Sequence, residues 1–108
     1  MNKYQRQELS NIVDCLQNII DDPQSYENWS EDISGYASDV EIMADEEQEK
    51  YDNLPENLQW SSRADEYQDN VSALQDAQYA LESAAECESI EDAEDDINEA
   101  ISKIEELI

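Results

Sequence analysis

Glycine and proline are almost absent from this chain, and that scarcity restricts the folds open to it more than any other feature of the sequence. The 108 residues contain one glycine, Gly35, and two prolines, Pro23 and Pro55. Tight β-hairpin turns depend on glycine, and phosphate-binding loops are built from several glycines. The sequence therefore disfavours an all-β fold and a nucleotide-binding loop.

Apolar residues recur at steps of three and four along the chain, which is the spacing that places them on one face of an α-helix. Four stretches with this spacing predict four helices, and only two or three residues connect the third to the fourth. A connection that short makes these two helices an antiparallel hairpin. We therefore expect a single acidic all-α domain over residues 1–108, a small bundle of about four helices at Lys3–Asp21, Pro23–Asp52, Arg63–Glu86 and Ile90–Ile108.

Local signals predict where these helices begin or change direction. Asp22 is expected to cap a second helix that starts at Pro23, because a proline at the first helical position loses no hydrogen bond. Gly35, inside the second helix, indicates a close helix crossing or a bend. A capping arrangement at Ser62 opens the third helix, and Ser89 is the expected N-cap of the fourth.

The charge of the chain argues against catalysis. It has no histidine, 30 Asp and Glu, and five Lys and Arg, which gives a net charge of −25 at pH 7. Histidine most often does acid–base work near neutral pH, and little positive charge is present to stabilise a developing anion. The acidic run Glu91–Asp96 lacks the glycine of a calcium-binding EF-hand loop. We therefore predict no enzyme activity, no metal site and no other cofactor.

The N-terminal residues are polar and lead into an amphipathic segment, with no apolar run of export or membrane-spanning length. We therefore expect a cytosolic protein without membrane contact. In that compartment Cys15 and Cys87 are expected to stay reduced.

The arrangement of the acids is more informative than their number. Nine acids and no base lie in residues 82–99, and the interval from Ala64 to Ser102 contains no Lys or Arg. On one continuous helix these eighteen residues would span roughly 27 Å, about one negative charge per 3 Å, close to the phosphate spacing along one DNA strand. Ten more acids in residues 31–56, against the single Lys50, predict a second acidic surface. The acids predicted to act as surrogate phosphates are Glu82, Glu86, Glu88, Glu91, Asp92, Glu94, Asp95, Asp96 and Glu99.

The main connection of the chain is predicted at Asn53–Ser61, with a short turn at Pro55–Leu58. Trp60 lies in this connection and outside every apolar stripe, whereas Trp29 belongs to the stripe of the second helix and is expected in the core. Two interpretations of Trp60 stay open. It covers the end of the bundle, or it is an exposed partner-binding anchor, a role in which tryptophan is enriched.

Residues 51–59 read Tyr51-Asp52-Asn53-Leu54-Pro55-Glu56-Asn57-Leu58-Gln59, and Ser62-Arg63 and a Leu- and Ala-rich acidic helix follow. This run resembles a family of short acidic helical proteins of Gram-positive phages and mobile elements. The resemblance covers residues 51–81, and Ala64 stands where family members tend to have glycine. It implies a phage or mobile-element origin and no particular activity. In size, helicity and charge the chain is also similar to phage DNA-mimic proteins that block restriction enzymes, CRISPR nucleases or other DNA-binding host factors.

Helical carboxylates at phosphate-like density present to a DNA-binding cleft the field that its Lys and Arg side chains are arranged to meet. The sequence therefore predicts a DNA-mimic-type inhibitor that binds the basic surface of a DNA-binding host protein and does not bind nucleic acid itself. An acidic immunity or assembly protein that binds a basic partner without DNA mimicry is the alternative. A merely solvated or salt-adapted surface explains less, because solubility of a small domain needs a net charge of only about 2 to 8.

Added salt is expected to raise the melting temperature of this protein. Like charges repel within one small domain, and salt shortens the reach of that repulsion to about 10 Å at 0.1 M. Thermal unfolding followed by circular dichroism at low and physiological salt measures the effect. A melting temperature that stays flat or falls would contradict a single folded acidic domain, and folding only at molar salt would favour salt adaptation.

Overall fold

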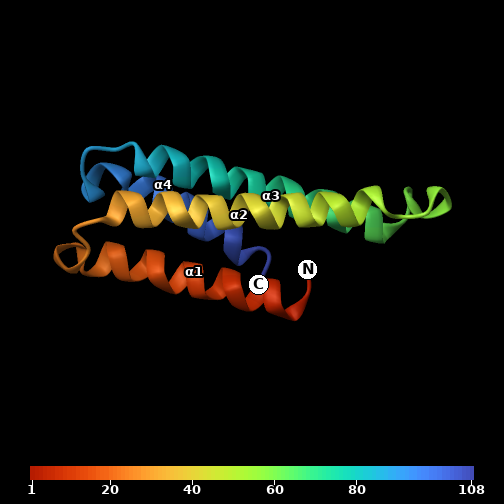
Figure 1. The fold of residues 1–108 in the computed structure, drawn as a ribbon, viewed down its shortest axis with the longest axis horizontal. Coiled ribbons are helices and arrows are strands. Elements are labelled where there is room, and N and C mark those ends of the chain that lie inside the picture. The colour runs from red at the N-terminus through yellow and green to blue at the C-terminus, as the bar shows by residue number, and fades with distance from the viewer.

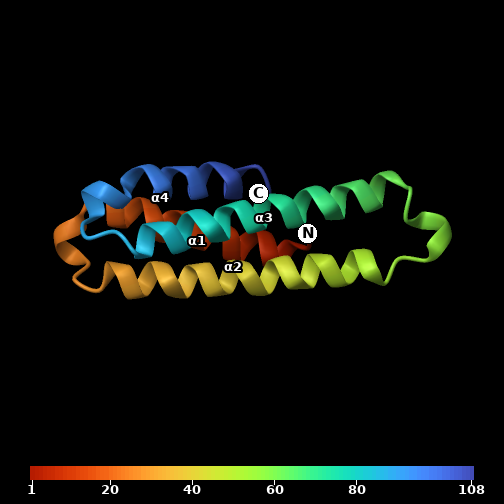
Figure 2. The ribbon, with the colours of Figure 1, turned by 90° about the horizontal axis from the view of Figure 1, so that it is seen from above.

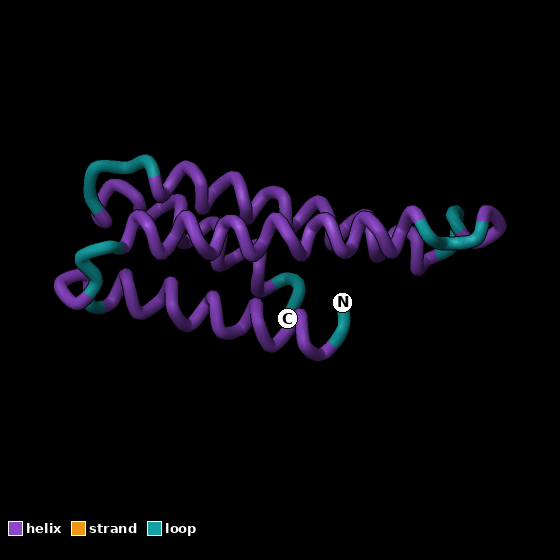
Figure 3. Tube along the Cα trace, viewed as in Figure 1, coloured by secondary structure: helices purple, strands orange, loops and turns teal.

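Four α-helices run alternately up and down a rod 52 Å long and 23 × 18 Å across (Figure 1). The computed structural model describes residues 1–108 and contains helices and loops but no strand (Figure 3). The helices are α1 (Lys3–Asp21), α2 (Trp29–Asp52), α3 (Ser62–Ala85) and α4 (Ile90–Glu105), with single 3-10 turns η1 (Pro23–Ser25) and η2 (Glu56–Leu58). Helices α3 and α4 pack against each other as an antiparallel hairpin, so the predicted all-α bundle is confirmed.

Helix α1 has the predicted bounds, and its start is fixed by a reciprocal cap. The Asn2 side chain accepts a hydrogen bond from the Gln5 backbone N–H at 2.8 Å, and the Gln5 side chain accepts one from the Asn2 backbone N–H at 3.1 Å. This capping box satisfies two backbone donors that a helix start otherwise leaves unpaired.

The second helix begins six residues later than predicted, at Trp29 and not at Pro23. Pro23 opens only the 3-10 turn η1, because the Asp22 carboxylate accepts a hydrogen bond from the Ser25 hydroxyl at 2.6 Å and caps no backbone N–H. The prediction of a close helix crossing at Gly35 is also wrong. Helix α2 continues unbroken through Gly35, and a Cβ atom added there would meet nothing within 4 Å.

The third and fourth helices start close to their predicted positions. Ser61, and not Ser62, caps α3 by accepting a hydrogen bond from the Ala64 backbone N–H at 3.3 Å. Ser89 caps α4 as predicted, through the Asp92 backbone N–H at 3.1 Å. The prediction that this helix reaches the C-terminus is wrong, because α4 ends at Glu105.

One apolar core joins all four helices. Trp29, predicted in the core, lies half-buried at its edge. The 19 buried members are Leu9, Ile12, Leu16, Ile19, Ile33, Ala37, Val40, Met43, Ala44, Leu74, Ala77, Ala80, Leu81, Ala84, Ala93, Ile97, Ala100, Ile101 and Ile104.

Helices α2 and α3 extend well past the two chain termini, so one end of the rod is a two-helix projection (Figure 2). The connection Asn53–Ser61 forms the tip of this projection, and η2 lies within it close to the predicted turn. All four helices therefore overlap only in the part of the rod that is nearer to the α1–α2 and α3–α4 connections.

A buried carboxylate lies in the half of the rod from which α2 and α3 project. The Glu47 side chain of α2 is fully buried and accepts hydrogen bonds from Lys50 Nζ at 2.6 Å and from Asn70 Nδ2 of α3 at 3.1 Å. Gln5 of α1 is also buried, donates to the Glu46 carboxylate at 2.8 Å and accepts from Lys50 Nζ at 2.9 Å. This polar network links α1, α2 and α3.

Replacing Glu47 with alanine is expected to lower the free energy of unfolding by about 3 kcal/mol, because removing one partner of a buried ion pair leaves the other polar groups unmatched. The exposed Glu49 provides a control with the same change in charge, and Glu49→Ala is expected to stay within about 0.5 kcal/mol of the parent. Urea unfolding measures both variants. Equal unfolding midpoints would contradict a stabilising role for the network.

Candidate protein-interaction surface

The nine predicted acids lie on the outside of the α3–α4 hairpin. Eight are exposed, and Asp96 is half-buried because the Ser83 hydroxyl of α3 donates a hydrogen bond to its carboxylate at 2.9 Å. Helix α4 buries only its apolar face, which leaves the carboxylates on the remaining faces. Glu82 belongs to α3, Glu86 and Glu88 to the connection, and Glu91, Asp92, Glu94, Asp95, Asp96 and Glu99 to α4.

These acids do not form one straight line of charge. The chain reverses at residues 86–89, so the roughly 27 Å expected for a continuous helix is wrong. On α4 the acids also divide between two sides. Helical spacing puts Asp92, Asp96 and Glu99 on the side that faces α3, and Glu91 and Glu94 on the other. A single flat partner surface can reach only part of the set.

Charge is segregated along the rod. Residues 7–49 and 64–102 contain 26 of the 30 acids and no Lys or Arg. Each stretch runs along one helix to the end where the α1–α2 and α3–α4 connections lie and returns along the next helix (Figures 1 and 2). We call this end of the rod, residues 14–41 and 76–99, the acidic end. It holds 18 acids, and the five bases all lie outside it: Lys3, Arg6, Lys50, Arg63 and Lys103.

The rod has a length and a charge comparable to those of a short DNA duplex. A net charge of −25 over 52 Å corresponds to one charge per about 2.1 Å. Duplex DNA carries one charge per roughly 1.7 Å of its axis, so 52 Å corresponds to about 15 base pairs. A basic groove built for duplex DNA therefore meets a similar charge density here.

Trp60 does not cover the end of the bundle, because its side chain is 93% exposed. Its backbone is held on both sides, since the Leu58 carbonyl accepts hydrogen bonds from the Ser61 N–H at 3.1 Å and from the Ser61 hydroxyl at 2.5 Å. Leu58 is exposed as well, so two apolar side chains are presented at the tip of the α2–α3 projection. The role of Trp60 as an interface anchor stays a prediction.

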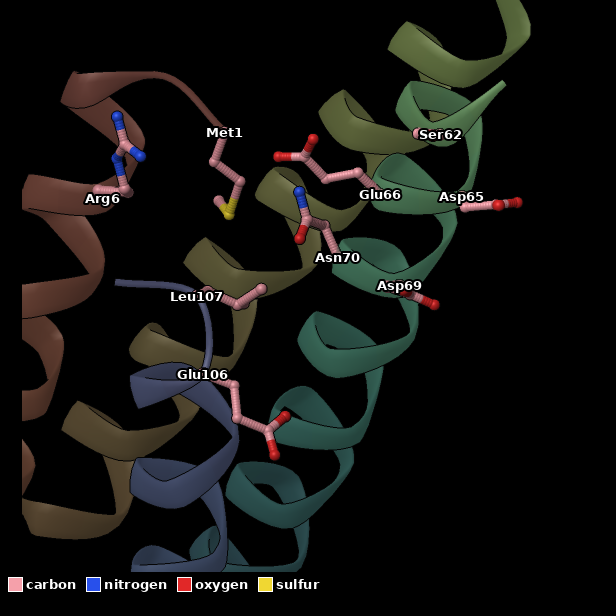
Figure 4. Close-up of a pocket in the computed structure, with 9 residues that line it drawn as sticks. All are labelled: Met1, Arg6, Ser62, Asp65, Glu66, Asp69, Asn70, Glu106 and Leu107. Atoms are coloured by element: carbon pink, nitrogen blue, oxygen red, sulfur yellow. The ribbon is translucent and has the colours of Figure 1, made fainter. Parts of the chain in front are cut away.

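The largest hollow, about 440 Å³, lies between the start of α1, the C-terminal residues and α3 (Figure 4). Glu66 and Asn70 extend into it from α3, whereas Asp65 and Asp69 point away. Its remaining lining residues are Met1, Arg6, Ser62, Glu106 and Leu107. No group of three His, Cys, Asp or Glu side chains in the molecule is arranged to hold a metal ion.

A second hollow, about 390 Å³, lies between α3 and α4, and all of its lining residues except Lys103 belong to the acidic end. Tyr79, Asp76 and Lys103 line it, and none of them was selected from the sequence. The available signal was spacing, because residues 76, 79, 80 and 83 share one face of a helix, as do residues 96, 99 and 103. The sequence alone does not predict that these two helix faces lie against each other in the folded protein.

Two side chains have shifted acid–base properties. Burial raises the pKa of the Cys87 thiol, and the negative charges of Asp96, Asp92 and Glu86 raise it further. Burial and the neighbouring Cys15 thiol raise the pKa of Tyr36. Both cysteines are free thiols, and carboxylates of the acidic end account for part of the raised Cys87 pKa.

No protein family, curated protein or solved structure matches the chain. None of the helices combines the length and apolar character needed to span a bilayer.

Salt is expected to accelerate alkylation of Cys87 by the uncharged reagent iodoacetamide. A raised pKa leaves less thiolate at a given pH, and screening of the nearby carboxylates lowers that pKa. The experiment uses the Cys15→Ser variant at a pH just below the ordinary thiol pKa, with the urea-unfolded chain as control. A rate in the folded protein that does not change with salt would contradict a strong local negative potential.

Proposed function

We propose that this protein binds the nucleic-acid-binding surface of a basic protein and blocks it by mimicking DNA. The observation that supports the proposal is the segregation of charge, with 18 acids and no base at one end of a rod whose net charge density approaches that of a duplex. The protein acts by binding, without catalysis or a cofactor.

Exposed carboxylates substitute for phosphates in this mechanism. Lys and Arg side chains that evolved to neutralise a DNA backbone pair with the carboxylates of the acidic end, and both surfaces release counterions. Opposite charge also accelerates the encounter and makes it strongly dependent on salt. The target loses access to DNA because its own basic groove is occupied.

We infer a phage or mobile-element origin from the resemblance of residues 51–81, which places the protein in the cytosol of a bacterial host. Its targets in that setting are restriction enzymes, CRISPR nucleases or other DNA-binding host factors. Proteins of these classes bind nucleic acid through basic surfaces, with which the carboxylates of the acidic end would pair.

An immunity or assembly protein that binds a basic partner without DNA mimicry is the second candidate. The observation that favours it is Trp60, which is almost fully exposed on a turn with fixed backbone hydrogen bonds. Tryptophan is enriched among the few residues that dominate binding energy at protein interfaces. In this case affinity depends on the tip of the projection more than on the acidic end.

Capture of partners from a host lysate on immobilised protein, followed by elution with duplex DNA, separates the two candidates. A DNA mimic and a duplex exclude each other, so the duplex is expected to displace the bound partner. A partner that stays bound at saturating DNA would overturn the mimicry proposal.

Neutralising Glu86, Glu88, Glu94 and Asp95 to their amides is expected to weaken binding of the captured partner at least tenfold at low salt and to flatten its salt dependence. These four acids lie outside the first turn of α4, where Glu91 and Asp92 stabilise the helix dipole. The control neutralises four exposed acids that lie outside the acidic end, namely Asp45 and Glu49 of α2 and Glu66 and Asp69 of α3. If both variants lose affinity equally, only net charge matters and the acidic end is not the site.

The same binding assay tests Trp60→Ala. Under DNA mimicry, the substitution is expected to weaken binding only slightly and to leave the salt dependence unchanged. A loss as large as 2 kcal/mol or more, about thirtyfold, is the size of a hot-spot residue and would favour the second candidate.

A further inference from the structure

The groove between α3 and α4 contains an exposed aromatic ring opposite an unpaired carboxylate. Its lining comes from two turns of each helix: Asp76, Tyr79, Ala80 and Ser83 on α3, and Asp96, Glu99 and Lys103 on α4. Tyr79 is 61% exposed, whereas Ala80 is only 7% exposed and forms the floor. The groove is therefore open, about 390 Å³ in volume, and carries a flat ring on one of its walls.

Contacts between the helices fix both ends of the groove. At one end the Ser83 hydroxyl donates to the Asp96 carboxylate at 2.9 Å. At the other end Lys103 Nζ lies 3.6 Å from the Asp76 carboxylate. Glu99 lies between these contacts and makes no hydrogen bond or ion pair of its own. Asp96 is bonded only to a neutral hydroxyl, so three acids and one lysine leave the groove with two unmatched negative charges.

Tyr79 is distinguished from the other exposed aromatic residues by its surroundings. Tyr4 and Trp60 are also exposed, but Tyr4 lies between Lys3 and Arg6, and Trp60 lies three residues from Arg63. Within the base-free stretches 7–49 and 64–102, Tyr79 is the one exposed aromatic side chain. Carboxylates are common over these stretches, but an exposed aromatic ring lies among them only at Tyr79.

We infer that this groove binds an arginine side chain of the basic partner. The guanidinium group stacks on the Tyr79 ring and pairs with the Glu99 carboxylate, while its aliphatic stem lies over Ala80. Arginine fits better than lysine because its planar group both stacks on an aromatic face and forms two parallel hydrogen bonds to a carboxylate. The free lone pairs of Asp96 lie at the same wall and add negative potential.

This inference rests on the proposed function in one respect, the basic partner, and deepens it by naming a contact that duplex DNA does not offer. Phosphates also form two parallel hydrogen bonds to arginine, but the phosphate backbone of a duplex has no aromatic ring on which the guanidinium group can stack. The groove would thus give the protein a preference among basic surfaces of equal charge.

Titration of the isotope-labelled full chain with capped triarginine and trilysine peptides tests the inference by NMR. Triarginine is expected to bind about two- to fivefold more tightly, the size of a cation–π contribution at an exposed site. Its largest shift changes are expected at the amides of Tyr79, Ala80 and Ser83 on α3 and of Glu99 on α4. Equal affinities, or shift changes spread evenly over the acidic surface, would overturn the assignment.

Variants separate the ring from the charge. Tyr79→Leu is expected to abolish the preference for arginine, and Tyr79→Phe to preserve it. Glu99→Gln is expected to weaken triarginine binding more than Glu41→Gln, which removes the same charge from an exposed site on α2. Since these side chains are exposed, all four variants are expected to fold as the parent does, which circular dichroism checks.

The outcomes distinguish this inference from the proposed function. If Tyr79→Leu binds both peptides as the parent does while duplex DNA still displaces the captured partner, the groove assignment fails and DNA mimicry stands. If the arginine preference is present but duplex DNA does not displace the partner, mimicry fails and the groove remains.

Discussion

Apolar burial between the helices is the interaction that holds this molecule together against its own charge. The molecule has thirty acids but only three ion pairs. Two of these pairs involve Glu47, which lies 4.0 Å from the Met1 amino group and 2.6 Å from Lys50 Nζ. The third joins Lys103 to Asp76. A fully buried leucine or isoleucine contributes about 1.5–3 kcal/mol, and 19 buried residues form one core. This apolar core therefore offsets the repulsion among acids that have no positive partner.

Uncompensated charge is greatest in the half of the rod where all four helices overlap. At the acidic end all four helices overlap, and each contributes fully buried aliphatic side chains, such as Leu16, Ile33, Leu81 and Ile97. In the half with the two-helix projection, the interior instead includes Gln5 and Glu47, and four of the five bases lie in the adjacent segments. The unmatched acids therefore gather where all four helices pack together, and most of the bases lie where the interior is polar.

The fold was largely predictable from the sequence because one physical pattern, an apolar stripe at helical spacing, defines each helix independently of the others. The errors arose where a local signal had a second physical outcome. Asp22-Pro23 matches a helix start, but a nearby hydroxyl, Ser25, engaged the carboxylate and limited the helix to one turn. Gly35 indicates a crossing only if another helix approaches it, and that depends on tertiary packing.

The candidate surface was predictable only in part, because a charge count along the chain does not include the reversal of the chain. Eight of the nine predicted acids are exposed and Asp96 is half-buried, but they do not follow the straight line of charge expected of one helix, because α4 folds back on α3. Tyr79 and Glu99 are twenty positions apart in sequence and line the same groove only because of the register of α3 against α4. Sequence patterns define faces of helices, and packing decides which faces share a groove.

Because successive helices run in opposite directions, the positions of the bases along the chain leave one end of the rod without positive charge. The chain runs to the acidic end and back once between Arg6 and Lys50, and once more between Arg63 and Lys103. All five bases therefore lie in the rest of the rod. A molecule with one strongly negative end turns that end toward a basic surface before contact. Trp60, at the opposite end of the 52 Å rod, is then the last part to reach the partner. A partner that buries both ends must extend along the full length of the rod, as a groove for about 15 base pairs of DNA would.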